Sequence, residues 1–217
     1  MSIEMSMGVW MDAVKRQYDS SGRRDRAARV GAALLETAHA MLLSDGYAST
    51  TIPRVAQACD VSVDSVYKRF PGKPALVRAV VEQALRGGGA IPAETRSDAV
   101  AADDLPELLQ SWGRLSAEVS PRVAPLLLLV RHAAEQDPSL ATLAAELDEQ
   151  RRVRMTHNAR RLAAAGHLRD RCTVQQAADI LWTYSSPELY DLLVRRAGWE
   201  VSRYGSFIAA GVAAHLG

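Results

Sequence analysis

The sequence is short of cysteine and of long apolar runs, and each shortage excludes a class of protein. Cys59 and Cys172 are the only two cysteines in 217 residues, so neither a disulfide framework nor a cysteine metal site is expected. No window reaches the roughly 18 apolar residues of a membrane span, and the amino terminus lacks the basic-then-apolar pattern of a signal peptide. We therefore expect a protein of the reducing cytoplasm with no membrane contact.

Aromatic residues are also scarce, at 6% of the chain, whereas alanine, leucine and arginine abound. That balance favours helix over sheet. A hydrophobic content of 48% allows a sizeable core, and no alternating strand pattern or internal repeat competes with the helical periodicity. The sequence predicts an all-α fold.

Motifs of catalysis and of cofactor binding are missing as well. The five histidines have no metal-ligand spacing, and they lie at positions 39, 132, 157, 167 and 215. Gly87, Gly88 and Gly89 follow no strand and precede no Gly-Lys-Ser/Thr, so they form no phosphate loop. Neither a nucleophile elbow nor a dinucleotide fingerprint is present. We expect no enzyme activity, no cofactor and no metal.

The net charge of +1 is unevenly distributed. Residues 15–86 carry 12 Lys and Arg against 7 Asp and Glu, a net +5, whereas the first 14 residues and the stretch from residue 90 onward each carry −2. Segregated positive charge indicates nucleic-acid contact better than a uniformly solvated surface does.

Two short helices in this basic region are predicted to form a helix-turn-helix. Thr50 and Thr51 supply hydroxyls that can cap a helix in which Pro53 occupies the first turn. Ser62 is expected to cap the next helix, with Ser65 in the capping-box position. The second helix is long enough to enter a major groove. On it Val61, Val66 and Phe70 should point inward, and the exposed side should carry Val63, Asp64, Ser65, Tyr67 and Lys68.

Composition divides the chain into four parts. Residues 1–22 have weak periodicity and are predicted to be a mobile arm, and residues 23–86 form the helix-turn-helix DNA-binding domain. Residues 87–103, which begin with three glycines, are predicted to be a linker. Residues 104–217 are predicted to be a helical domain for effector binding and dimerisation, in which Pro121 and Pro125 open a separate helix. About nine or ten helices are expected in all.

Several of these motifs together resemble the tetracycline-repressor (TetR) family of bacterial regulators. The matching elements cover about a quarter of the chain, and they are Gly46-Tyr47, Thr50-Thr51, Val55-Ala56, Val61-Ser62, Val66-Tyr67, Phe70 and Lys73-Pro74-Ala75-Leu76. The segments Ala178–Trp182 and Ser186–Tyr190 also look like parts of the family's larger helical domain. The departures are Asp60, where members often have glycine, Pro53 within the first of the two short helices and the acidic Asp64.

The resemblance implies a three-helix DNA-binding head, a larger helical-bundle body, a homodimer and a palindromic operator. By it, Thr50, Thr51, Ser65, Tyr67, Lys68 and Lys73 correspond to DNA-contacting positions, and the candidate DNA-binding set adds Arg54, Ser62 and Asp64. The predicted function is a transcriptional regulator, a repressor that a small-molecule effector releases from double-stranded DNA.

An effector pocket is predicted between helices of the C-terminal domain. Its candidate residues are Trp112, Leu128, Arg131, His132, Met155, Asn158, Trp182 and Tyr184. Arg131 and His132 stand out because polar groups in an apolar helix require partners. The last helices, with Ile180, Tyr184, Leu192, Phe207, Ile208 and Val212, are expected to include the dimer interface.

Two other function classes remain open. A helical protein-interaction module could use the helix-turn-helix for packing alone, and it would bind no duplex even at low salt. An enzyme with a helical body would need a convergent set of titratable groups, which the sequence does not reveal.

Overall fold

A computed structural model describes the backbone of residues 4–216 and the side chains of residues 24–216. This part of the chain contains helices and no strand. The all-α prediction is therefore confirmed. Across the same residues, no helix has both the length and the apolar character needed to cross a membrane.

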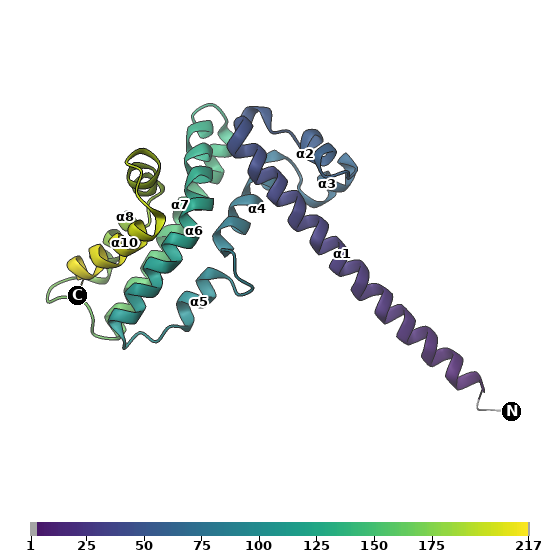
Figure 1. The fold of residues 1–217 in the computed structure, drawn as a ribbon, viewed down its shortest axis with the longest axis horizontal. Helices are drawn as coiled ribbons and strands as arrows, with labels where there is room; N and C mark the ends of the chain where they lie inside the picture. The colour runs from purple at the N-terminus through teal and green to yellow at the C-terminus, as the bar shows by residue number, and fades with distance from the viewer. Residues whose placement is uncertain (1–3, 217) are drawn as a thin grey trace.

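Four helices make up the N-terminal part, hereafter the head: α1 (Glu4–Ser49), α2 (Ile52–Ala58), α3 (Val63–Arg69) and α4 (Lys73–Arg86). Helix α1 is interrupted at Gly46, whose φ of 79° and ψ of 173° leave the helical region. Glycine adopts a positive φ at little steric cost. Upstream of the interruption, α1 runs past α2 and α3 and projects beyond the rest of the molecule (Figure 1).

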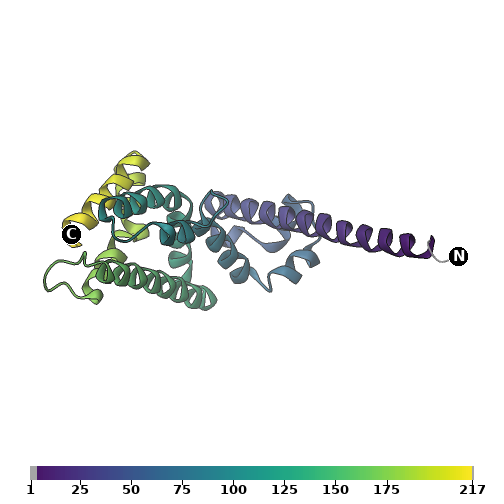
Figure 2. The same ribbon diagram turned by 90° about the horizontal axis from the view of Figure 1, so that it is seen from below.

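The remaining elements form the body: α5 (Ala93–Ala99), α6 (Leu105–Ala134), α7 (Pro138–Ala164), α8 (Val174–Tyr184), α9 (Pro187–Tyr190), the π-helical turn η1 (Asp191–Arg196) and α10 (Val201–Leu216). Helix α6 runs through the body and packs against α7, α10 and the head helices α1 and α4. Seen from below, the head and the body lie at opposite ends of the molecule (Figure 2).

Three segments differ from the predicted boundaries. The backbone of residues 4–22 belongs to α1, so no helix boundary separates the predicted arm from the DNA-binding domain. The predicted linker contains α5. The helix break expected at Pro121 and Pro125 was wrong, because α6 continues through both prolines. Val123, Ala124 and Leu126 are buried there, and tertiary packing of this kind offsets the backbone hydrogen bonds that proline removes.

One hydrophobic cluster joins the two parts of the molecule. It includes Leu34 and Leu42 of α1 and Val77 of α4 together with Leu126 of α6 and Leu143 of α7. A second cluster lies between α6, α7, α8 and α10. Because the first cluster crosses from head to body, a displacement of α6 or α7 is transmitted to the head by direct packing.

Candidate nucleic-acid interface and body cavity

Side-chain caps fix the start of both short helices in the head. The Thr51 hydroxyl accepts a hydrogen bond from the Arg54 backbone N–H at 3.4 Å, and the Ser62 hydroxyl accepts one from the Ser65 N–H at 3.2 Å. Between the helices Asp60 has a φ of 52°. Aspartate is among the few residues other than glycine that tolerate this conformation. The departure from the family pattern at Asp60 therefore leaves the turn intact.

Helix α3 presents a polar face to solvent. Val66 and Phe70 are buried against the head core, as predicted, and Val61 is partly buried. The opposite side exposes Asp64, Ser65, Tyr67, Lys68 and Val63, with Tyr67 49% exposed. A short helix with small polar residues at its start and larger ones behind suits a major groove in shape and chemistry.

Arg69 holds α3 against α1 at a position that the sequence analysis missed. Its guanidinium donates to the backbone carbonyl of Ala27 at 3.4 Å. A Cβ placed on Gly31 would lie 2.2 Å from that guanidinium, so the end of the Arg69 side chain would have to shift if residue 31 were not glycine. The signal in the sequence was a glycine inside a long helix, where it otherwise costs stability.

Three predicted DNA-binding residues have their polar groups engaged within the head. Thr50 is 2% exposed and donates its hydroxyl to the Gly46 carbonyl at 2.9 Å. Arg54 donates to the Ser49 carbonyl at 2.6 Å and pairs with Asp45 at 2.8 Å. Thr51 caps α2, as described above. These three side chains shape the turn that precedes α2. Thr50 is withdrawn from the surface, whereas the Arg54 side chain is still 49% exposed.

Lys73 lies where the head meets the body. Its Nζ is 3.7 Å from the centre of the Tyr47 ring and 3.4 Å from the Ala48 carbonyl. The Tyr47 hydroxyl donates to Asp137 at 3.0 Å, and Asp137 caps α7. Burial lowers the pKa of Lys73, although Asp137 opposes that shift. Burial, together with the bond to Asp137, raises the pKa of Tyr47 to about 12.

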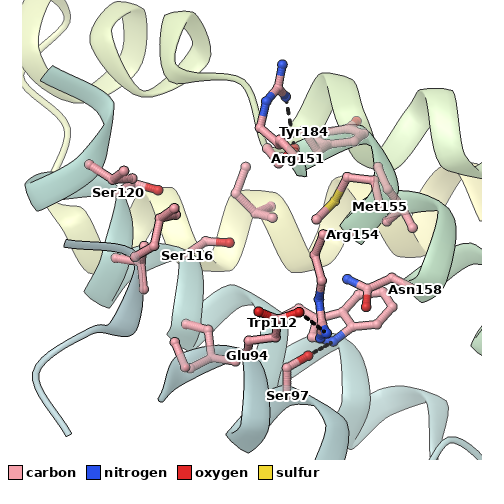
Figure 3. A pocket seen from close by; sticks show the side chains of 18 of the residues that line it. Glu94, Ser97, Trp112, Ser116, Ser120, Arg151, Arg154, Met155, Asn158 and Tyr184 are labelled. Carbon is pink, nitrogen blue, oxygen red and sulfur yellow. Dashed lines mark hydrogen bonds and ion pairs between the residues drawn. The ribbon is translucent and has the colours of Figure 1, made fainter. Parts of the chain in front are cut away.

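A cavity of about 770 Å³ lies in the body between α5, α6, α7, α8 and α10 (Figure 3). Four of the eight predicted pocket residues line it, namely Trp112, Met155, Asn158 and Tyr184. The other four, Leu128, Arg131, His132 and Trp182, are not in its lining. The structure thus brings half of the predicted residues together on the wall of one cavity and leaves the other half outside it.

Arg131 and His132, the two polar residues singled out as pocket candidates, do not face the cavity. Arg131 pairs with Asp148 at 2.6 Å and with Glu188, and the His132 side chain is 82% exposed. Trp182 packs on the guanidinium of Arg151, whose Cζ is 4.5 Å from the ring centre. Periodicity alone placed Arg131 and His132 in an apolar helix, but it could not show which side of that helix faces the cavity.

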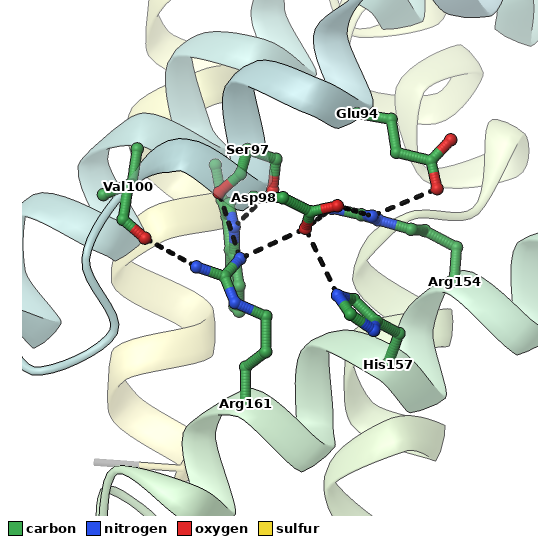
Figure 4. A network of polar contacts seen from close by, with 8 residues as sticks. Glu94, Ser97, Asp98, Val100, Arg154, His157 and Arg161 are labelled. Atoms are coloured by element: carbon green, nitrogen blue, oxygen red, sulfur yellow. Dashed lines mark hydrogen bonds and ion pairs between the residues drawn. The ribbon is translucent and has the colours of Figure 1, made fainter.

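Helix α5 covers one side of the cavity and is fastened to α7 by a polar network (Figure 4). Asp98 accepts from Arg154 at 2.8 Å and from Arg161 at 3.5 Å, and it lies 3.2 Å from His157. The hydrogen bond from Arg154 lowers the pKa of Asp98, although burial opposes the shift. These contacts tie α5 to α7.

Two further contacts join α5 to α6. The Trp112 indole N–H donates to the Ser97 hydroxyl at 3.0 Å. Arg96 forms an ion pair with Glu118 at 2.6 Å, and Glu118 also accepts from the Gly88 N–H at 2.8 Å, just beyond the end of α4. A shift of α5 would therefore reach α4 through Glu118 and the short connection between the two helices.

The sequence profile of the bacterial regulatory proteins of the tetR family matches residues 34–80. The chain carries a tetR-family domain. That segment runs from α1 through both short helices into α4, so the predicted resemblance is confirmed on the residues that carry it. No curated protein matches the sequence at a significant level.

Solved structures extend the likeness from the tetR-family domain to nearly the whole chain. The SmeT–triclosan complex aligns with a TM-score of 0.67 at 19% identity, covering 87% of this chain and 92% of SmeT. A transcriptional regulator from Saccharomonospora viridis in complex with choline aligns at 0.64 and 18% identity, covering 88% and 98%. A TetR-family regulator from Rhodococcus sp. aligns at 0.63 and 15% identity, covering 85% and 97%. The fold of the head and body is thus shared with these regulators.

Proposed function

We propose that this chain is a sequence-specific DNA-binding transcriptional regulator. The observation that carries the proposal is the exposed polar face of α3 within a tetR-family domain. Ser65 and Asp64 are at the start of α3, where short side chains can approach base edges, and Tyr67 and Lys68 are suited to contacts with phosphates. Asp64 would accept from the N4 amino group of cytosine. Ser62, as the cap of α3, orients this face.

The regulator acts as a homodimer on a palindromic operator. Helices α8 and α10 pack on one side of the body and against each other, and their outer faces would form the two-fold interface. A two-fold dimer places two copies of α3 in successive major grooves, with half-site centres about 34–36 Å apart. Each copy of α3 then reads one half-site.

We further propose that a small molecule in the body cavity releases the protein from DNA, which makes it a repressor. The cavity is bounded by α5, and α5 connects to α4 through Arg96, Glu118 and Gly88. The hydrophobic cluster shared by head and body offers a second route. A ligand that favours one position of α5 would change the spacing of the two heads, and operator affinity would fall.

A gel-shift experiment tests the proposal. The full chain is titrated into duplexes that cover the DNA flanking its own gene, with a shuffled duplex of equal composition as control. We expect binding to one flanking duplex that survives excess shuffled competitor and weakens as salt rises. Failure to bind any duplex at low salt would instead support a protein-interaction module.

A further inference from the structure

The lining of the body cavity contains few charges that a ligand could use. Most of the wall is apolar, with Trp112, Val123, Leu127, Leu181 and Ile208 among its members. The acidic Glu149 is exposed to solvent. Every other charged side chain of the lining is already paired within the protein.

Arg154, on the α7 wall, is fully engaged with α5. It pairs with Asp98 at 2.8 Å and with Glu94 at 3.1 Å, and its side chain is only 17% exposed. Asp98 is shared further with Arg161 and His157. A charged ligand would have to displace one of these partners, which leaves another buried or half-buried charge without compensation.

Arg151 is turned away from the other labelled cavity residues (Figure 3). Its guanidinium donates to the Trp182 carbonyl at 2.6 Å and to the Ser185 hydroxyl at 3.1 Å. It also stacks on the Trp182 ring. Its Nε is buried without a hydrogen-bond partner among the described residues. The terminal N–H groups are nevertheless engaged with Trp182 and Ser185, which leaves Arg151 poorly placed to receive an anionic group from the cavity.

Asn158 is the uncharged residue of the described wall in which a buried polar atom lacks a partner. It is 6% exposed, lines the cavity and reaches into it from α7, as Met155 does (Figure 3). Its Oδ1 is buried with no hydrogen-bond partner among the described residues. A buried amide without a partner costs free energy that a ligand can recover by supplying the hydrogen bond.

We infer that the cavity takes an uncharged, largely apolar molecule that carries one hydroxyl or amide group, and that this group bonds to Asn158. The amide of asparagine both donates and accepts, and rotation about its last side-chain bond exchanges the two ends. The apolar wall would cover the rest of the molecule. This inference rests on the proposed effector role of the same cavity and specifies the chemistry of the ligand.

Three probes with the same ten-carbon chain separate the possible ligand classes. We would titrate 1-decanol, decanoate and decyltrimethylammonium into the full chain by calorimetry. We expect 1-decanol to bind at least about tenfold more tightly than either ion, because the cations of the wall are already engaged and its remaining carboxylate, Glu149, is exposed to solvent and already hydrated. Equal or tighter binding of either ion, or no detectable binding of 1-decanol, would overturn the inference.

Variants of the α7 wall test the role of Asn158. Replacing Asn158→Leu should weaken 1-decanol binding roughly fivefold and leave the binding of 1-chlorodecane, which has no hydroxyl to donate, within about twofold. Met155→Leu, on the same wall, should change neither affinity by more than about twofold. An unchanged affinity of Asn158→Leu for 1-decanol would refute the assignment. If Asn158→Leu does not fold, the three-probe series on the unaltered chain still decides whether the cavity prefers an uncharged ligand.

A gel shift on the same protein preparation keeps the two proposals apart. Duplex binding together with a failed probe series would reject the ligand class and leave DNA binding standing. A successful probe series without duplex binding would instead reject the proposed function as a DNA-binding regulator. Duplex binding that 1-decanol weakens, and the two ions do not, is the result expected if both proposals hold.

Discussion

The outer face of α3 and the wall of the body cavity use polar side chains in opposite ways. On α3, Ser65, Tyr67 and Lys68 face solvent, and the groups that position them, such as the Ser62 cap and Arg69, lie beside or behind that face. In the cavity, charged groups such as Arg154 and Asp98 are bonded to one another.

The difference indicates two kinds of partner. An exposed cation keeps its hydration until a phosphate replaces it, so a surface such as α3 can bind a highly charged polymer at modest desolvation cost. In an enclosed wall each charge must be paired inside the protein, and binding then depends on apolar contact and on a few hydrogen bonds. The predictions below test this contrast, in order of decreasing effect.

The largest effect is expected from removing the free side chains of α3. The double variant Tyr67→Ala/Lys68→Ala should weaken operator binding about 100-fold, because two contacts of roughly 1 to 2 kcal/mol each are lost. Its melting temperature should stay close to that of the unaltered chain, since both side chains are exposed. Fluorescence anisotropy with labelled operator and a thermal melt measure the two quantities.

Arg160→Ala is the matched control, because Arg160 is an exposed basic residue of α7 in the body. Its operator affinity should remain within about twofold of that of the unaltered chain. Comparable losses in Arg160→Ala and in the double variant would show that overall charge, not the face of α3, governs binding.

A second prediction concerns packing in the body. A Cβ on Gly113 of α6 would lie 2.5 Å from the carbonyl of Gly205 on α10. Gly113→Ala should therefore lower the free energy of unfolding by about 2 kcal/mol, since the two backbones must separate. Gly88→Ala is the control, because nothing lies within 4 Å of a Cβ there. Urea denaturation of both variants checks this, and equal stability would disprove the close crossing.

The features of the head that depend on local sequence could be predicted, whereas those that depend on packing could not. The caps at Thr51 and Ser62 and the inward face of α3 follow from local chemistry, and the structure has them as predicted. The burial of Thr50 and the contact between Arg69 and Gly31 depend on residues that packing brings together. No local pattern contains that information.

The body was harder to predict for the same reason. Its helices follow from periodicity, but the cavity wall depends on how five of them are rotated about their axes. Arg131 and His132 were chosen because polar residues in an apolar helix need partners, and Arg131 found them in Asp148 and Glu188 outside the cavity. Asn158 was also among the eight predicted pocket residues. Of those eight, it is the one that both lines the cavity and has a buried polar atom without a hydrogen-bond partner.

A third prediction concerns Lys73, which is engaged within the protein like the charges of the cavity wall and yet lies in the head, as α3 does. It packs on Tyr47 and is partly buried, yet it begins α4, where the N-terminal end of a helix favours a phosphate. Lys73→Met should weaken operator binding about tenfold and reduce the salt dependence of binding by about one ion. Arg86→Ala, at the other end of α4, should change neither quantity. A Lys73→Met protein with unaltered affinity and salt slope would confine Lys73 to the contact between head and body.

The smallest effect is expected from acid, through the network that fastens α5. The pKa of Asp98 is lowered in the folded protein by its hydrogen bond from Arg154, against the opposing effect of burial. A carboxyl group with a lowered pKa stabilises the fold above its unfolded pKa, and this contribution disappears as the pH falls through the folded value. Between about pH 5 and pH 3, the protection of α5 amides against exchange, measured relative to the intrinsic exchange rate at each pH, should therefore fall before that of α6 and α7 does.

Asp98→Asn tests whether Asp98 carries this effect. The Asp98 side chain is 42% exposed, so its pairing should contribute less than about 1 kcal/mol. The variant should show lower protection in α5 already at pH 7 and a smaller further fall in protection on acidification. Exchange at the start of α3 should be the same in both proteins, because Asp98 contacts α7 and not the head. An equal fall of protection in α5 and α3 would mean that acid loosens the molecule as a whole, and the paired charges of the cavity wall would then have no separate role in holding α5.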